Sequence, residues 1–99
     1  MREITQGDIR AAARVLVARP RSDWPALVAG MLEAAHHADC HRKALGRVHG
    51  RLGNGTLMAV ALGRGPVPEP QASDGAYLDA MAAVIEAVIL WRTDRASRR

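Results

Sequence analysis

Residues 76–91 read AYLDAMAAVIEAVILW. Asp79 and Glu86 are the only charged residues in this stretch, and their spacing places them on one side of a helix. The other sides are apolar, and a helix that is apolar nearly all round has to be buried nearly all round. A chain of 99 residues has little else to bury it with. The stretch therefore predicts an oligomerisation helix that packs against other copies of the chain.

The side chains expected at this contact between chains are the large apolar ones of the stretch. They are Leu78, Met81, Ile85, Val88 and Ile89. A basic tail follows, with Arg92, Arg95, Arg98 and Arg99. Residues 76–99 are thus predicted to be an associating helix with a cationic end, which can attract a polyanion.

Two further helices are expected before residue 50. Thr5 and Asp8 have the spacing of a capping box for a first helix, which Pro20 would end. A second helix is expected to start near Ser22–Asp23, with Pro25 in its first turn, and to run to about Arg47. Its apolar residues recur at steps of four and three, the heptad rhythm of an antiparallel helix pair. The members of this seam are Leu27, Met31, Ala34, Ala38, His41, Leu45 and Val48.

Glycine and proline divide the rest of the chain. Residues 50–55, GRLGNG, predict a loop with positive φ angles, after which Thr56 can cap a short helix over residues 57–62. Residues 63–75 contain GPVPEP and predict an extended connector, with Ser73 or Asp74 as the cap of the last helix.

The fold class expected is therefore all-α, with about four helices, an antiparallel helix pair and a C-terminal oligomerisation helix. The regions are an N-terminal helical part over 1–62, the connector over 63–75 and the apolar helix with its basic tail over 76–99. Together they form one compact domain, because a chain of this length supports one modest core.

Composition restricts the location and the kind of partner. The net charge is +4, and Arg supplies all but one of the 14 basic side chains, Lys43 being the exception. Cys40 has no second cysteine to pair with, residues 1–10 lack the apolar core of a signal peptide, and residues 76–91 are too short and too acidic to span a membrane. We expect a cytoplasmic protein without membrane contact.

His36, His37, Cys40 and His41 form the cluster that most suggests metal or nucleophile chemistry. His36 with Cys40, and His37 with His41, are each one helical turn apart, but the two pairs point about 100° from one another. One ion cannot easily take all four, and a single helix supplies no oxyanion hole or pocket. The sequence predicts no metal, no cofactor and no enzymatic activity.

Direct reading of DNA bases is not expected, because residues 57–62 carry no polar side chain that could reach a base edge. Contact with phosphates remains available to the basic residues near the end of the second helix. The predicted DNA-binding residues are Arg42, Lys43, Arg47 and Arg51, helped by Arg10, Arg14 and the Arg92–Arg99 tail. An ordinary solvated basic flank is the competing interpretation.

Two stretches resemble a family of short alphaproteobacterial proteins, the small terminase subunits of gene-transfer-agent and prophage-type DNA-packaging clusters. They are DWPALVAGMLEAAHHADCHRKALGRVHGRLGNGTLMAVAL, residues 23–62, and YLDAMAAVIEAVILWR, residues 77–92, with the proline connector between them. The resemblance covers over half of the chain and consists of Ala, Leu and Gly patterns without a catalytic signature.

The resemblance implies a bacteriophage-like DNA-packaging adaptor that forms a homo-oligomeric ring, binds double-stranded DNA and delivers it to the large terminase subunit. Many such proteins carry an N-terminal helix-turn-helix domain, and this chain has no room for a separate one. That departure puts site-specific recognition in doubt and suits indiscriminate packaging.

Two other classes stay open. One is a helical protein–protein interaction module, such as a regulator or an antitoxin-like partner, which makes no direct contact with DNA. The other is a small metal-binding or enzymatic protein that uses residues 36–41.

Overall fold

The computed structural model describes residues 2–47, 50 and 53–97, and this part of the chain is all-α. Helix α1 spans Gln6–Leu16, a single 3₁₀ turn η1 spans Arg21–Asp23, and α2 follows directly over Trp24–Leu45. The short helix α3 spans Leu57–Leu62, and α4 spans Gly75–Ser97. The expected all-α class with four helices is confirmed for the described residues.

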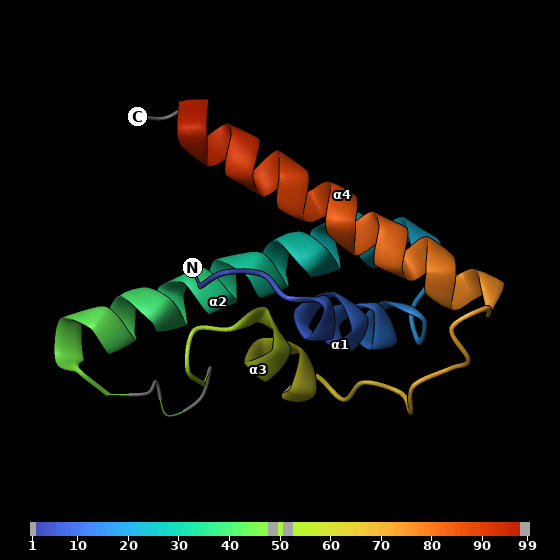
Figure 1. Ribbon diagram of the computed structural model, residues 1–99, viewed down its shortest axis with the longest axis horizontal. Helices are drawn as coiled ribbons and strands as arrows, with labels where there is room; N and C mark the ends of the chain where they lie inside the picture. Colours follow the sequence, from blue (N-terminus) through green and yellow to red (C-terminus); the bar gives the residue numbers. More distant parts are fainter. Residues whose placement is uncertain (1, 48–49, 51–52, 98–99) are drawn as a thin grey trace.

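The helices are arranged around α1, which lies between α3 and α4 (Figure 1). After the turn η1 the chain reverses and α2 runs back across the molecule, while α1 packs mainly on α3 and α4 (Figure 1). The long helices α2 and α4 start at the same end of the molecule and diverge toward their C-termini (Figure 1). The radius of gyration, 13.3 Å, is about that of a single folded domain of this length.

The N-terminus of α1 is held by the predicted capping box, which also ties α1 to α3. The Thr5 hydroxyl accepts from the Asp8 amide at 3.2 Å, and the Thr5 amide donates to the Asp8 carboxylate at 2.8 Å. The second carboxylate oxygen of Asp8 accepts from the Met58 amide in the first turn of α3, at 2.9 Å. Because Asp8 is only 2% exposed, this carboxylate is a buried link between two helix N-termini.

The core forms where α1 meets the other helices. Three consecutive alanines, Ala11, Ala12 and Ala13, are buried and allow the neighbouring helices to approach α1 closely. The large side chains that fill the remaining space come from all four helices. The most completely buried of these are Leu16, Met31, Leu32, Leu57, Tyr77 and Val84.

The buried face of α2 is not the predicted heptad seam. Met31 and Ala38 belong to both, but the structure buries Trp24, Val28 and Ala35 in place of the seam's Leu27 and Ala34, which are half-buried. His41 is also half-buried, Leu45 is 55% exposed, and Val48 lies outside the described residues. Two apolar stripes with the same spacing run along this helix, so spacing alone does not identify the stripe that is buried.

The ends of the helices follow local signals with small shifts. Gly46, with φ of 69°, caps α2 just before Arg47, and Asp74 caps α4 by accepting from the Tyr77 amide at 3.0 Å. Helix α1 ends at Leu16, earlier than Pro20 would require, and the Leu16 carbonyl accepts from the Trp24 indole at 2.7 Å and from the Arg19 amide at 2.8 Å. In the predicted loop, Gly53 and Gly55 do have positive φ. A Cβ atom on Gly55 would lie 2.8 Å from the Asp39 backbone, so only glycine fits there.

Candidate functional site

Helix α4 presents three different apolar faces, and each has a different environment. The face toward the core carries Tyr77, Ala80, Val84 and Val88, which are all buried within the chain. The chain's own core therefore explains one of the three apolar faces of this helix. The other two faces are open.

The first open face is a row of aliphatic side chains on the outer side of α4. We call it the α4 ridge, and it consists of Leu78, Ala82, Ile85 and Ile89. Leu78 is 48% exposed, Ile85 45% and Ile89 58%, which is unusual for three large aliphatic side chains on one helix face. A contiguous row of exposed apolar side chains makes this face a candidate interaction surface.

The five predicted oligomerisation residues therefore divide into three groups. Leu78, Ile85 and Ile89 lie on the ridge, and Met81 is half-buried against the core. Val88 is 9% exposed and packs inside its own chain.

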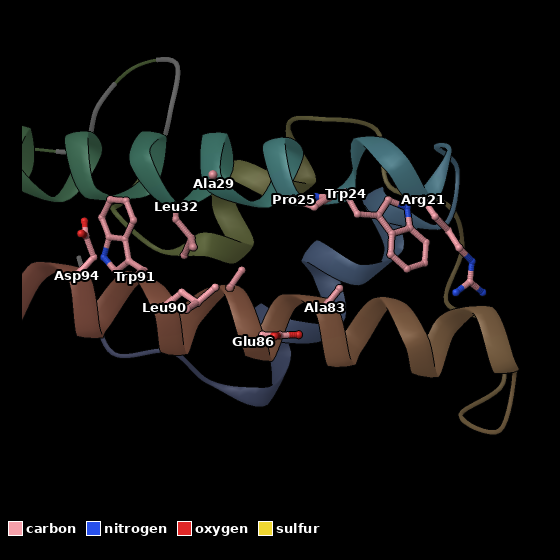
Figure 2. Close-up of a pocket in the computed structure, with 11 residues that line it drawn as sticks. Arg21, Trp24, Pro25, Ala29, Leu32, Ala83, Glu86, Leu90, Trp91 and Asp94 are labelled. Carbon is pink, nitrogen blue, oxygen red and sulfur yellow. The ribbon is translucent and has the colours of Figure 1, made fainter.

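The second open face of α4 forms a groove with α2. Figure 2 shows side chains from both helices directed into it. The α2–α4 groove encloses about 560 Å³. Its lining residues are Arg21, Trp24, Pro25, Ala29, Leu32, Ala83, Glu86, Ala87, Leu90, Trp91 and Asp94. The walls are mostly apolar, and Leu90 remains 63% exposed at the edge.

A tryptophan and an arginine stand near each end of the groove. The Arg21 guanidinium lies 5.1 Å from the Trp24 ring and forms an ion pair with Asp79 of α4 at 2.8 Å. At the other end, Arg95 lies 4.5 Å from the Trp91 ring, whose edge meets His36 of α2 at a centroid distance of 5.9 Å. Burial lowers the pKa of the His36 imidazole, and the charge of Arg95 lowers it further.

The predicted DNA-binding cluster at the end of α2 is built around a buried acid. Asp39 is 1% exposed and accepts from Arg42 at 2.8 Å and from Lys43 at 3.2 Å. Burial alone would raise the pKa of the Asp39 carboxyl, but the hydrogen bonds from Arg42 and Lys43 outweigh it and hold the pKa well below the ordinary value. Arg42 and Lys43 therefore bind Asp39 of their own helix, which partly neutralises their positive charge.

The outward-facing charge of this cluster comes from two residues. Lys43 keeps 64% of its side chain exposed, and Arg47 is exposed just beyond the end of α2. Arg51 lies outside the described residues.

The two predicted basic helpers on α1 contact the proline connector. Arg14 donates through Nε to the Val67 carbonyl at 2.7 Å, and the Val67 amide donates back to the Arg14 carbonyl at 3.2 Å. Arg10 lies 3.5 Å from Glu69, which also accepts from the Tyr77 hydroxyl at 2.9 Å. Burial raises the pKa of Tyr77, and this hydrogen bond raises it further. Arg14 therefore has a defined part in holding the connector against α1.

The histidine–cysteine cluster lies along α2, and its His36 contacts Trp91 of α4. The Cys40 sulfur lies 3.6 Å from His36 Nε2, one helical turn away. Within the part of the chain that the structure describes, no group of three or more His, Cys, Asp or Glu side chains could hold a metal ion.

Sequence reasoning missed Asp39, Trp24 and Trp91 as organising residues. Asp39 could have been found from its spacing, because Arg42 and Lys43 follow it at three and four positions. The tryptophans have neighbouring arginines at such spacings, Arg21 before Trp24 and Arg95 after Trp91, but the contacts of Trp24 with the Leu16 carbonyl and of Trp91 with His36 depend on the tertiary structure.

Comparison with known proteins gives a family and no further relative. No curated protein matches the chain, and no solved structure does. Among residues 2–47, 50 and 53–97, no helix is long and apolar enough to cross a membrane. A family described as "Domain of unknown function (DUF7742)" matches residues 2–88. The match includes α1, α2 and α3 and ends at Val88, the last buried residue of α4. The chain belongs to the DUF7742 family.

Proposed function

We propose that this protein is a self-assembling helical adaptor of the small-terminase type. It would associate through α4 into a homo-oligomer in the cytoplasm, hold double-stranded DNA by charge and present that DNA to a large terminase ATPase. The sequence resemblance suggests the packaging role, and the surface of α4 supports the self-assembly on which that role depends.

The observation that carries this proposal is the α4 ridge. Three large aliphatic side chains stand about half exposed on one face of a helix that packs another face into the core. Full burial of a large aliphatic side chain contributes roughly 1.5–3 kcal/mol, so burying the exposed half of one ridge side chain contributes about half of that. Every copy of the chain carries the same exposed apolar side chains, so burying them between copies favours assembly.

The basic residues support the part of the proposal that concerns DNA. Each chain has a net charge of +4. Lys43 and Arg47 are exposed at the end of α2, and Arg92 is 67% exposed on α4. Repeating these charges in an oligomer raises weak single-chain attraction to phosphates by orders of magnitude.

The α2–α4 groove favours a second candidate function. An apolar groove bordered by two tryptophans is a common recess for an amphipathic helix of another protein. In that case the chain is a protein–protein interaction module, and it is a monomer or a dimer without affinity for DNA.

Native mass spectrometry at micromolar concentration separates the two candidates. We expect a homo-oligomer larger than a dimer for the wild type and a monomer for Ile85→Asp. The matched control is Leu62→Asp, because Leu62 is a similarly exposed aliphatic residue, 52%, on the distant helix α3. Circular dichroism checks that both variants remain helical. A wild type that stays monomeric at high micromolar concentration contradicts the adaptor.

The link to packaging is tested separately by genome context and by capture. A large-terminase gene beside this one, and retention of that ATPase by the immobilised oligomer, are the expected results. An oligomer that retains neither the ATPase nor DNA rejects the packaging role.

A further inference from the structure

We infer that the α2–α4 groove of one chain receives the α4 ridge of a second copy, so that chains join head to tail. This inference rests on the self-assembly proposed above and specifies its geometry. It starts from the fact that ridge and groove are two different surfaces of the same helix.

The positions of the two surfaces on α4 leave both of them accessible. At 100° per residue, the ridge positions and the groove positions Ala83, Ala87 and Leu90 are centred about 130° apart around the helix. A chain can therefore hold one neighbour in its groove while its ridge enters the groove of another.

The lengths of the two surfaces match. Along α4 the ridge extends from Leu78 to Ile89, and the groove extends from Ala83 to Asp94. Both spans cover the same number of residues and measure about 16 Å at 1.5 Å per residue. A ridge of one copy therefore fills the groove of the next along its whole length.

Shape favours this pairing over a symmetric one. The ridge is a convex row of aliphatic side chains, and the groove is a recess of about 560 Å³ with mostly apolar walls. Helices pack by placing the ridges of one into the grooves of the other. Two ridges facing each other would leave both grooves open.

The charges at the ends select the direction in which the second helix lies. The groove has Arg21 at the end near Ala83 and Asp94 at the other. Arg21 already pairs with Asp79 of its own chain at 2.8 Å, so Asp94 is the lining residue that can attract a cation of a second copy. Arg92 follows the ridge on α4, its side chain is 67% exposed, and it lies 3.7 Å from Glu3. With the two α4 helices parallel, Arg92 of one chain approaches Asp94 of the next, whereas the antiparallel arrangement brings Arg92 toward Arg21, which is unfavourable.

A contact of this kind is heterologous, because the two partners use different surfaces. Every added chain leaves one open ridge and one open groove, so the assembly grows until the rotation per subunit closes it. A symmetric ridge-to-ridge contact would stop at two chains.

A mixing experiment with two complementary variants tests the inference. Ile85→Asp disables the ridge and keeps the groove, whereas Ala29→Arg fills the groove and keeps the ridge. Ala29 and Ile85 are both exposed, so neither substitution disturbs the core. We expect each variant alone to be monomeric and the equimolar mixture to form a one-to-one heterodimer that grows no further, as read by native mass spectrometry.

Three outcomes would count against the head-to-tail contact or the proposal beneath it. If Ala29→Arg assembles like the wild type, or if the mixture contains no heterodimer, the head-to-tail contact is wrong while self-assembly stands. If the wild type itself does not assemble, the proposed function fails as well. Leu90→Asp serves as a second groove variant and should behave like Ala29→Arg, so that a folding defect in one variant cannot imitate the result.

Discussion

Asp39 shows how one buried carboxylate changes the meaning of the charges around it. Arg42 and Lys43 are typical residues for contact with phosphate, yet both donate to Asp39 on their own helix. The backbone of Gly55 also packs against Asp39, so this residue lies where the 53–56 segment meets α2. Removal of the carboxylate charge should affect folding before it affects any ligand.

We predict that Asp39→Asn lowers the free energy of unfolding by about 1–3 kcal/mol, because the charged hydrogen bonds from Arg42 and Lys43 become weaker. Chemical denaturation at pH 7 measures the change. Glu33→Gln is the control, since Glu33 lies on the same helix and meets Arg95 only at the surface, at 4.0 Å. The control should change stability by less than about 1 kcal/mol. Equal effects of the two substitutions would contradict a structural role for Asp39.

The stabilisation by Asp39 should also depend on pH. The pKa of its carboxyl is lower in the folded chain than the ordinary value of 3.8. The stabilising contribution is therefore complete above pH values near that ordinary pKa, and it is lost as pH falls through the lower folded value. The difference in unfolding free energy between wild type and Asp39→Asn should stay constant from neutral pH to about pH 5 and shrink below pH 4. A difference that grows on acidification would show the opposite sign of pKa shift.

At the scale of the helices, local signals in the sequence predicted more than periodicity did. Thr5, Thr56 and Asp74 cap helices as expected, because a cap depends on residues three positions apart. The burial of α2 depends on its neighbours, so the predicted seam through Leu27 and Leu45 was wrong in phase.

The candidate site, too, was only partly predictable from the sequence. The apolar excess of residues 76–91 was visible in the sequence, but its separation into core, ridge and groove required the positions of α1 and α2. Val88 shows what the sequence cannot distinguish. It is an aliphatic residue on the same helix as the ridge residues, and only the tertiary structure places it in the core.

The connector gives a prediction about Arg14. Its Nε donates to Val67, and the return bond from Val67 completes a two-bond link between α1 and the connector. Arg14→Ala should therefore destabilise the fold by about 1 kcal/mol and speed proteolysis within residues 63–74. Arg19→Ala, an exposed charge beyond the end of α1, is the control and should leave both unchanged. If Arg14→Ala is as stable as the control and loses DNA binding instead, Arg14 belongs to the DNA surface.

For the whole molecule, the distribution of charge favours binding DNA without sequence preference. Lys43 and Arg47 are exposed near the C-terminal end of α2, where they also complement the helix dipole, and further exposed arginines such as Arg10, Arg19, Arg64 and Arg92 lie elsewhere on the described surface. Such side chains reach phosphates and carry no base readout. Binding should therefore be similar for two unrelated duplexes of equal length and should weaken steeply as salt rises, because counterions are released.

The variant that tests this surface is Lys43→Gln with Arg47→Gln, which leaves the Arg42–Asp39 pair in place. We expect weaker binding and a salt dependence reduced by about 0.9 in logarithmic slope for each phosphate contact removed. Arg19→Gln with Arg64→Gln removes the same charge from exposed positions elsewhere, so it separates a local surface from net charge alone. Equal losses in the two variants would mean that net charge, and not the end of α2, attracts DNA.

The affinity for DNA should also fall in Ile85→Asp. The basic residues of this variant are intact, but a single chain presents too few phosphate contacts. Unchanged affinity in that variant would separate DNA binding from assembly.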